Sequence, residues 1–516
     1  MNIGVAIGRS ARRTPEAVAV YDGDRVLTYA ELDRRTDRLA RVLLDRYGLA
    51  KGDRVALLLS NRAEVVEVLG AAAKAGLTYC GLNFRLAEAE YDEILGNADP
   101  GILITGAEHA EMAARLAERH SLPVVDVDAT GDDGYETLLD GAGDARVPEV
   151  HGVRPEDDFC IVYTSGTTGR PKGVLFDNNA VLLHAMVAVT EYELDADSRW
   201  LVALPHNSSV QITLLPLLIM GGAIVFAESR GFDAHRFAAQ ANRFGATHTY
   251  LVPTMLFRLL DAGITAEEIA SVTTIGYGAA PIPPPRVKEL VERFGPRFIQ
   301  LYGMAEVASI GTMLRKDDHV RALEPGSRIL ESCGRPSYAM DVRVVDDAGG
   351  DVGPGERGEV IFGSPHTMKG YYRDPERTAD ALIDGWMHSG DIGEIDEEGY
   401  IYIVDRKKDL IIRGGLNIVP SEIENVLYSH PAVLEAALVG VPDPEWGEAL
   451  VAAVALKDGA EAGEAEIVEW CAEHDLPSMK RPESVVFREA LPKNAVGKIA
   501  KNVIRDEVVA AREAGA

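Results

Sequence analysis

Residues 163–174, Tyr-Thr-Ser-Gly-Thr-Thr-Gly-Arg-Pro-Lys-Gly-Val, constrain this chain more than any other segment. Their glycines let backbone N–H groups face an anion, and Thr164, Ser165 and the other hydroxyls add donors. Arg170 and Lys172 add positive charge. The apolar run 160–162 precedes them and predicts a buried strand. The segment therefore predicts a strand followed by a phosphate-holding loop; the alternative is the surface turn that Gly/Ser/Thr clusters usually form.

The loop is not a Walker A motif, because the Gly-Lys pair of this chain is followed by Ile499 where Ser or Thr would be needed. It resembles the phosphate loop of the class I adenylate-forming superfamily, which includes acyl-CoA synthetases, adenylation domains and luciferases. Four further elements of that superfamily follow in order: Tyr302-Gly303-Met304-Ala305-Glu306, Trp386–Asp391 with its Ser-Gly-Asp, Asp405–Asp409 with Gly414-Gly415 after it, and Pro492–Ile499. The resemblance extends from about Thr28 to Arg505 and indicates an acyl-CoA ligase-like member.

Composition narrows the class of protein. A chain of 516 residues predicts at least two domains, and 47% apolar residues is typical of a globular protein. The net charge of −29 argues against nucleic acid or anionic membranes as partners. The longest uncharged stretch, 200–227, is too broken to span a bilayer, and no secretory signal opens the chain. Four cysteines lie far apart, so we expect reduced thiols in a cytoplasmic protein.

Strand-like and helix-like segments alternate along the first half of the chain, which predicts an α/β fold with parallel sheets flanked by helices. Thr28-Tyr29-Ala30-Glu31 reads as a capping box that opens a helix through about Tyr47. The other expected helices are 61–76, 234–244, 285–294, 420–429, 464–474 and one after Lys501, and the expected strands are 55–59, 102–105, 160–163, 223–226, 358–362, 400–404, 435–441 and 449–456.

The expected domains are a large N-terminal domain over 1–404, a hinge at 405–408 and a small mobile α+β C-terminal domain over 409–516. By composition alone, 405–408 could be a hairpin turn; the resemblance makes it the hinge. The Gly/Asp-rich segment 131–152 is expected to be a surface connection.

The resemblance implies a reaction in two halves that uses ATP, Mg²⁺ and CoA. A carboxylate attacks the α-phosphorus of ATP, giving acyl-AMP, and a thiol then displaces AMP. Catalysis of the first half is mainly charge neutralisation and alignment. Lys498 is expected to bridge carboxylate and α-phosphate, Glu306 to bind Mg²⁺, and Thr164 to contact phosphate. A solvated lysine is the alternative for Lys498.

The same resemblance assigns the nucleotide site. Tyr302 would pack on adenine, unless it is an ordinary core aromatic. Asp391 would accept from the ribose hydroxyls with help from Arg406, unless the two form a surface ion pair. Lys408 would be the hinge residue. The remaining expected contacts are, for the nucleotide, Ser165, Gly166, Thr167, Thr168, Gly169, Lys172, Gly278, Ala279, Ala280, Pro281, Gly303, Met304 and Ala305, and, for the pantetheine tunnel, Gly414 and Gly415.

Two departures from the superfamily pattern stand out. Ala305 occupies a position that usually carries Thr or Ser, so one hydrogen bond to the α-phosphate is missing; adenylation could be slower, Thr164 could compensate, or the chain could perform only the thioester half. Asn207 stands where amino-acid-activating members carry an aspartate, and an amide cannot balance a buried ammonium. The acid is therefore expected to be unaminated, in a pocket near His206, Asn207 and Tyr277, although His206 could equally be structural.

The predicted function is thus an ATP-dependent acyl-CoA synthetase. The first rival is an adenylating enzyme that loads an acyl carrier protein; fatty acyl-AMP ligases of that kind tend to carry an insertion that is not seen around 405–408. The second is a half-reaction or non-catalytic member, which Ala305 favours and Lys172, Glu306, Asp391 and Lys498 oppose. The identity of the acid and the oligomeric state are left open.

Overall fold

The structure is a computed structural model that describes residues 2–144, 146–147, 152–164, 171–208, 210–226, 231–407, 409–414, 416–444, 446–457, 459–474, 476–493 and 499–515. The chain forms two compact units, one of residues 1–342 with 362–388 and the other of 343–361 with 389–516. Residues 389–404, expected in the N-terminal domain, thus group with the C-terminal part. The hinge at 405–408 stays a prediction.

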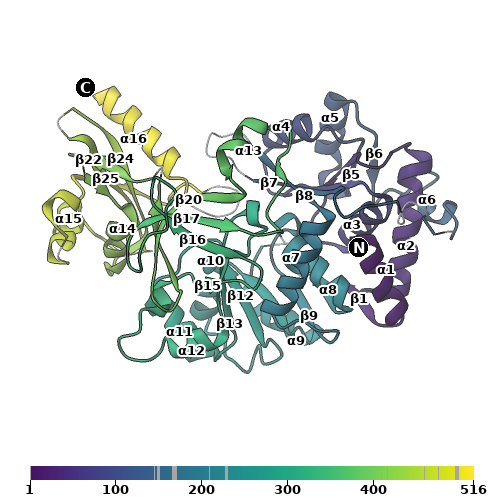
Figure 1. The fold of residues 1–516 in the computed structure, drawn as a ribbon, viewed down its shortest axis with the longest axis horizontal. Helices are drawn as coiled ribbons and strands as arrows, with labels where there is room; N and C mark the ends of the chain where they lie inside the picture. Colours follow the sequence, from purple (N-terminus) through teal and green to yellow (C-terminus); the bar gives the residue numbers. More distant parts are fainter. Residues whose placement is uncertain are drawn as a thin grey trace. The chain divides into compact units, whose positions relative to one another are not determined.

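Two mostly parallel sheets form the core of the first unit (Figure 1). Within the described residues, the strands of one sheet are, in spatial order, β15 (Arg335–Pro336), β14 (Thr312–Leu314), β13 (Phe298–Tyr302), β12 (Thr274–Gly278), β11 (His248–Leu251), β9 (Arg199–Val202), β10 (Ala223–Phe226), β1 (Val18–Asp22) and β2 (Arg25–Thr28). Those of the other are β18 (Gly370–Tyr371), β8 (Lys172–Asp177), β7 (Asp158–Thr164), β4 (Thr78–Gly81), β3 (Arg54–Leu58), β5 (Ile102–Thr105) and β6 (Val124–Asp126). The predicted α/β class with parallel sheets is confirmed.

Helices of the first unit connect these strands. They are α1 (Ile3–Arg13), α2 (Tyr29–Arg41), α3 (Ala63–Ala75), α4 (Glu88–Ala98), α5 (Ala110–His120), α6 (Tyr135–Gly141), α7 (Asn178–Glu191), α8 (Leu215–Met220), α9 (Ala234–Phe244), α10 (Pro253–Asp261), α11 (Pro284–Phe294), α12 (Lys316–Arg321) and α13 (Pro375–Ala381). In Figure 1 the purple helices α1 and α2 lie beside α3, against which both pack.

Local sequence signals explain several boundaries. The predicted capping box at Thr28 is present, with the Glu31 carboxylate accepting from the Thr28 backbone N–H at 2.8 Å. The helix was predicted to run through about Tyr47, and past Arg41 it does continue, as a π-helical stretch over Val42–Arg46. Gly76, with φ of 70°, ends α3 in the left-handed conformation that glycine adopts without penalty.

The segment 131–152 was predicted as a surface connection, and this is wrong for its middle. Residues 135–141 form α6, whose Tyr135, Leu138 and Leu139 are buried. The helix is only seven residues long and is flanked by Gly/Asp-rich sequence, so helical periodicity had too few positions to appear.

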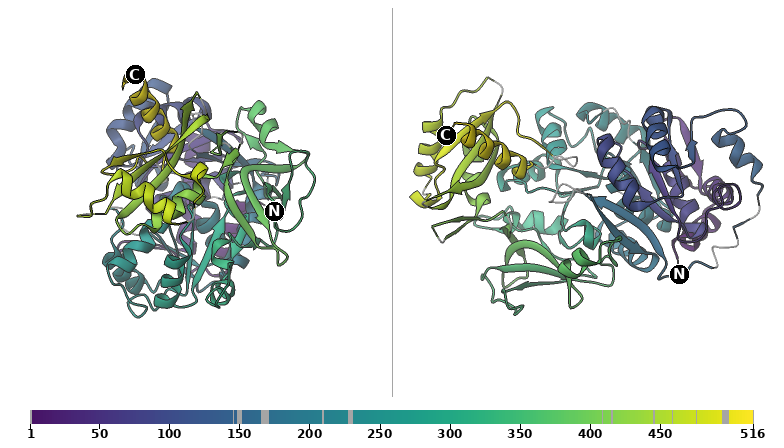
Figure 2. Two further views of the ribbon diagram at one scale, coloured as in Figure 1. Left: turned by 90° about the vertical axis from the view of Figure 1, so that its left-hand side faces the viewer. Right: turned by 90° about the horizontal axis from the view of Figure 1, so that it is seen from above.

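A third sheet contains β16 (Asp341–Val345), β17 (Gly358–Gly363), β20 (Trp386–Ile395), β19 (Leu382–Ile383) and β21 (Ile401–Arg406). The division of the chain into two units falls within β16, β17 and β20. The second unit also holds β23 (Leu416–Ile418), β22 (Ile411–Arg413), β25 (Gly447–Leu456), β24 (Val433–Asp443) and β26 (Ser484–Arg488). Alternate residues of β24 and β25 face α14 (Pro420–Ser429) and α15 (Glu464–Glu473) on one side, and α16 (Lys501–Gly515) on the other (Figure 2). This is the predicted small α+β domain.

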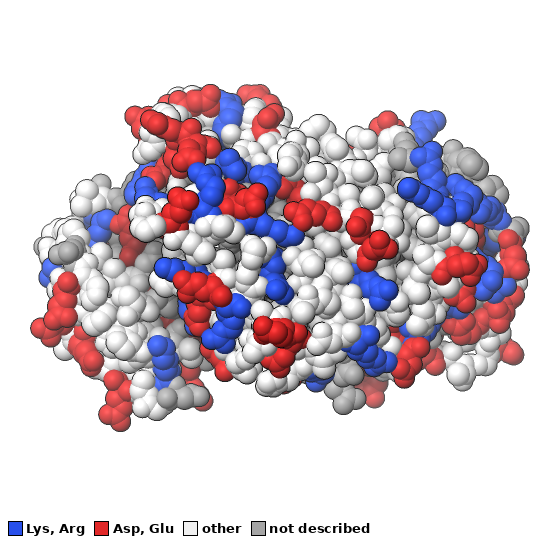
Figure 3. All heavy atoms as spheres, turned by 90° about the horizontal axis from the view of Figure 1, so that it is seen from below, with Lys and Arg blue, Asp and Glu red and all other residues white. Residues whose placement is uncertain are grey.

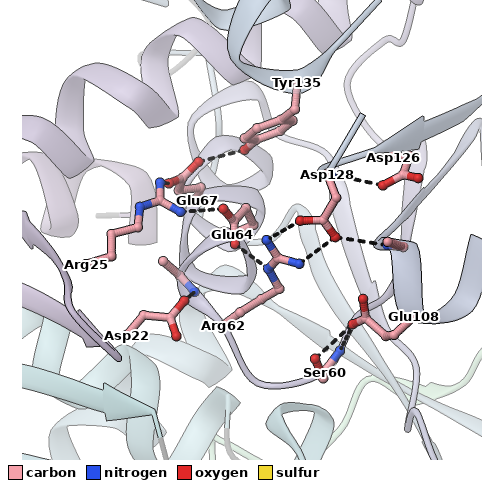
Figure 4. Close-up of polar contacts among 12 residues, drawn as sticks. Asp22, Arg25, Ser60, Arg62, Glu64, Glu67, Glu108, Asp126, Asp128 and Tyr135 are labelled. Carbon is pink, nitrogen blue, oxygen red and sulfur yellow. Dashed lines mark hydrogen bonds and ion pairs between the residues drawn. The ribbon is translucent and has the colours of Figure 1, made fainter. Parts of the chain in front are cut away.

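A network of buried charged side chains links the first turns of α3 to side chains of neighbouring elements through ion pairs and hydrogen bonds (Figure 4). The Glu67 side chain is fully buried and accepts hydrogen bonds from Arg25, Arg35 and Tyr135, the last at 2.7 Å. The nearby Glu64 pairs with Arg25 and Arg62. Since a buried carboxylate is tolerated only with such partners, the network determines how α3 packs on its surroundings.

On the face shown in Figure 3, both acidic and basic side chains are present among the described residues, with uncharged areas between them. Among the described helices, none is both long enough and apolar enough to cross a membrane.

Candidate functional site

The predicted phosphate loop connects two paired strands. Thr164 ends β7 and pairs with Lys172 at the start of β8 in antiparallel register, and both residues are partly exposed. The pairing therefore brings together the two ends of the loop. Ser165, Gly166, Thr167, Thr168 and Gly169 lie outside the described residues.

Glu306 is held by a tyrosine that the sequence did not single out. The Tyr371 hydroxyl donates to Oε1 of Glu306 at 2.6 Å, and the Met368 backbone N–H donates to the Glu306 carbonyl at 2.8 Å. Lys172 Nζ lies 5.1 Å from the centre of the Tyr371 ring, within the range of a cation–π contact. Tyr371 thus links two predicted site residues that are more than a hundred positions apart in the chain.

The surroundings of Tyr371 keep its hydroxyl protonated, so that it can donate a hydrogen bond. Burial, and next the neighbouring Glu306 carboxylate, raise the pKa of its hydroxyl well above the usual value near 10. The phenol therefore stays protonated, and its hydrogen bond to Glu306 persists over the whole physiological range. Neither chain spacing nor residue type signals this pairing, because Tyr371 lies on β18, which is placed by tertiary contacts such as its pairing with β8.

The backbone around Glu306 is unusual. Residues 305–307 form a single 3₁₀ turn, and the next two residues, Ala308 and Ser309, have φ of 53° and 76°. Consecutive left-handed residues other than glycine cost energy and cluster at functional sites. A Cβ on Gly303 would lie 2.6 Å from the Ser309 carbonyl oxygen, so only glycine permits this close approach. Met304 and Ala305 complete the turn.

The predicted adenine wall and Tyr302 lie at the ends of neighbouring parallel strands. Gly278 ends β12 and Tyr302 ends β13, and the register pairs Gly278 with Leu301. Ala279, Ala280 and Pro281 follow, partly or fully exposed, and Ala279 has a left-handed φ of 69°. Ligands of α/β sheets bind beyond the carboxyl ends of the strands, which is where these residues lie. The Tyr302 ring packs at a tilt against Phe362, with centroids 5.9 Å apart.

The three predicted acyl-pocket residues differ in their surroundings. His206 is fully buried; its Nε2 donates to the Leu59 carbonyl and its Nδ1 accepts from the Tyr79 hydroxyl, each at 3.1 Å. Both ring nitrogens are thus occupied by the protein itself, as in a structural histidine. Burial lowers the pKa of His206 to about 4, so the ring is neutral at pH 7.

Tyr277 is also buried, and its hydroxyl lies 2.8 Å from Nε2 of His319, on the face of β12 that packs into the core with Phe298. The side-chain Oδ1 of Asn207 is buried and has no hydrogen-bond partner among the described residues. Contact of His206, Asn207 and Tyr277 with the acid stays a prediction.

In the second unit, Asp391 and Arg406 are paired. They face each other across β20 and β21, and Arg406 Nε lies 3.1 Å from Asp391 Oδ1. The Ser389 hydroxyl accepts from the Asp391 backbone N–H at 2.9 Å. The Asp391 side chain is 11% exposed and that of Arg406 45% exposed, so the carboxylate is fixed while the guanidinium reaches solvent.

The remaining predictions fall at or beyond the limits of the described residues. Lys408, Gly415 and Lys498 lie outside them. Lys493 and Ile499 pair across an isolated bridge that brackets the segment containing Lys498. Gly414 is described, and its N–H donates to the Trp446 carbonyl at 2.7 Å.

The donor set around Glu306 fits a hard cation with few protein ligands. The described residues contain no group of three or more His, Cys, Asp or Glu side chains that could hold a metal ion. Mg²⁺ is commonly held by one or two carboxylates together with substrate phosphates and water. The single carboxylate of Glu306 matches that pattern.

Comparison with known proteins shows the family of this chain. The AMP-binding enzyme family matches residues 7–372, and the AMP-binding enzyme C-terminal domain matches residues 422–498. A feruloyl-CoA synthase from an Amycolatopsis species is 38% identical over 96% of this chain and 97% of its own. A fatty acid–[acyl-carrier-protein] ligase, ScoC of Streptomyces coeruleorubidus, is 32% identical over 96% of this chain and 94% of its own. The Bacillus subtilis o-succinylbenzoate CoA synthetase in complex with its acyl-adenylate is 30% identical, with a TM-score of 0.86 over 97% of this chain and 98% of that one.

Proposed function

This chain belongs to the AMP-binding enzyme family and is an AMP-forming acyl-CoA ligase, and from that premise we propose how its own residues carry out the reaction. ATP and CoA are its co-substrates. A carboxylate oxygen of the acid attacks the α-phosphorus of ATP and pyrophosphate leaves. The CoA sulfur then attacks the acyl carbonyl carbon, the thiol proton is lost, and AMP leaves with the attacking carboxylate oxygen.

The contact of Tyr371 with both Glu306 and Lys172 is the observation that carries the proposed assignment. Two anions must meet in the first half-reaction, so the site needs fixed positive charge and a fixed metal ligand. Lys172 supplies the charge beside the phosphate loop. Glu306, oriented by the Tyr371 hydroxyl, would hold Mg²⁺, which neutralises phosphate charge when bound.

We assign the other nucleotide contacts from the positions of the strand ends. Tyr302 and residues 278–281 would enclose adenine, since they lie at or just beyond the carboxyl ends of β13 and β12. Asp391, whose carboxylate offers only acceptors, would bind the ribose hydroxyls with Arg406 beside it. Thr164, with the loop residues after it, would donate to the phosphates.

Lys498 would bridge the acid carboxylate and the α-phosphate, and Lys408 would be the pivot between the two half-reactions. Gly414 and Gly415 would line the path of the pantetheine thiol, where side chains would obstruct its approach. These four roles rest on the superfamily pattern of the sequence.

The acid is proposed to lack an amino group, because Asn207 cannot balance an ammonium. The similarity to a feruloyl-CoA synthase makes aromatic acids the first class to test. The four cysteines are free and buried, which suits the reducing cytoplasm that we propose as the compartment.

A carrier protein is the second candidate acceptor, and the similarity to ScoC supports it. The test is a panel of aromatic, aliphatic and amino acids, scored for AMP and for thioester with CoA or with a phosphopantetheinylated carrier protein. We expect AMP and CoA thioester in equal amounts with unaminated acids. AMP without CoA thioester, but with loaded carrier protein, would establish the rival acceptor. Turnover of an α-amino acid would contradict the role given to Asn207.

A further inference from the structure

The position of Glu306 depends on a short segment of the chain, residues 364–371. The Met368 N–H donates to the Glu306 carbonyl at 2.8 Å, and the Tyr371 hydroxyl donates to the Glu306 carboxylate at 2.6 Å. One contact fixes the backbone of the proposed metal ligand, and the other fixes its side chain. The orientation of the Glu306 carboxylate therefore depends on where the 364–371 segment lies.

Two contacts attach the 364–371 segment to the elements that follow the phosphate loop. At one end, β18 pairs with β8, and the Lys369 N–H donates to the Leu175 carbonyl of β8 at 2.8 Å. At the other end, His366 contacts His184 of α7, the helix that begins directly after β8. Because β8 and α7 are consecutive in the chain, both contacts attach the segment to one strand–helix unit.

A buried hydrogen bond joins the two histidine rings. Nδ1 of His184 lies 3.1 Å from Nδ1 of His366, the rings are inclined by 22°, and both residues are fully buried. Burial lowers the pKa of both rings, to about 4 for His366, so both are neutral at pH 7 and one can donate to the other. Nε2 of each ring has no hydrogen-bond partner among the described residues. Both rings therefore lose this polar contact if the segment moves, and in a buried site that loss is costly.

We propose that His366, through its bond to His184, positions the Glu306 carboxylate for its metal ion. The inference rests on the proposed function, in which Glu306 holds Mg²⁺. His366 is a positioning residue: it fixes the segment, and Met368 and Tyr371 of that segment fix Glu306. Residues that orient a metal ligand commonly change metal affinity by roughly 10–100-fold, and a residue one step further away should have a smaller effect.

The test measures metal binding without turnover. Mn²⁺ replaces Mg²⁺, and α,β-methylene-ATP replaces ATP, because its α–β bridge cannot be cleaved in the adenylation step. The electron paramagnetic resonance signal of free Mn²⁺ gives the dissociation constant of Mn²⁺ from the enzyme–nucleotide complex. His366→Leu and His184→Leu each remove the hydrogen bond between the rings, and His366→Asn restores it, because an amide can donate or accept at the place of Nδ1.

Two further variants calibrate the measurement. Glu306→Gln gives the effect of losing the charge of the metal ligand itself. His248→Leu is the matched control: His248 is also buried, with Nε2 3.0 Å from the Tyr192 carbonyl, but it lies at the amino end of β11, away from the proposed nucleotide site. Thioester formation from supplied acyl-AMP, which needs no ATP phosphates, shows that each histidine variant is folded.

We expect both leucine variants of the His184–His366 pair to raise the Mn²⁺ dissociation constant by roughly fivefold, and His366→Asn and His248→Leu to keep the wild-type value. If one leucine variant does not fold, the other carries the same prediction. Binding by His366→Asn as weak as that of His366→Leu, or equally weak binding by His248→Leu, would overturn the inference. Unchanged binding in both leucine variants, with weak binding by Glu306→Gln, would also overturn it and leave the proposed function intact. Wild-type binding by Glu306→Gln would overturn the proposed metal ligand and the inference with it.

Discussion

At the scale of single residues, the proposed metal site depends most on the hydrogen bond from Tyr371 to Glu306. Tyr371→Phe leaves the Glu306 carboxylate without its fixed donor, so we expect a weaker metal site and slower adenylation. The Mg²⁺ concentration for half-maximal pyrophosphate release should rise by roughly tenfold, since a hydrogen bond to a charged group contributes about 1.5–3 kcal/mol. Tyr135→Phe removes the same kind of bond from the remote Glu67 and should leave the Mg²⁺ dependence unchanged. Equal Mg²⁺ dependence in both variants would show that Tyr371 does not contribute to the metal site.

Ala305 is the second test at this scale. If the absent hydroxyl weakens contact with the α-phosphate, Ala305→Thr should accelerate adenylation by up to roughly tenfold and leave thioester formation from supplied acyl-AMP unchanged. Ala305 is partly exposed, so the larger side chain has room. A wild type that fails to adenylate but uses acyl-AMP would instead establish the half-reaction rival.

At the scale of elements, the network around α3 gives a prediction about stability. Glu67→Gln removes a carboxylate that balances Arg25 and Arg35, and we expect the free energy of unfolding to fall by about 3–5 kcal/mol. Glu136→Gln is the matched control, because Glu136 also pairs with Arg35 but is 62% exposed, and its loss should cost at most about 1 kcal/mol. Denaturant titrations measure the free energy of unfolding of both variants. Equal losses would mean that the burial of Glu67 does not make its ion pairs more important for stability than those of Glu136.

The elements also show what sequence can predict. Elements with strong local sequence signals were predicted correctly: the capping box at Thr28 and the helix over 234–244 are present at their predicted positions. An element set by tertiary packing was missed, as α6 shows. The same holds for the site. Glu306 and Lys172 could be singled out from motifs, whereas Tyr371 is placed beside them by tertiary contacts such as the pairing of β18 with β8, which no local pattern encodes.

At the scale of the whole molecule, buried histidines predict how stability depends on pH. Burial lowers the pKa of His206, His248, His319 and His366 from 6.5 to about 4. Between these values the unfolded chain binds more protons than the folded one, so the free energy of unfolding rises with pH. We expect stability to fall as the pH drops from about 6.5 to about 4. In denaturant titrations across that window, the free energy of unfolding should fall less steeply with decreasing pH for His319→Gln than for the wild type. The same steepness in both proteins would contradict the lowered pKa of His319.

This enzyme joins the acid to AMP before it makes the thioester, and isotope transfer can test that order of steps. An acid labelled with ¹⁸O in both carboxylate oxygens is converted in the presence of ATP, Mg²⁺ and CoA, and the products are analysed by mass spectrometry. The attacking oxygen stays on phosphorus when the thiol displaces AMP, so we expect one ¹⁸O in each AMP and one in each acyl-CoA. AMP without label, or label in pyrophosphate or phosphate, would contradict it.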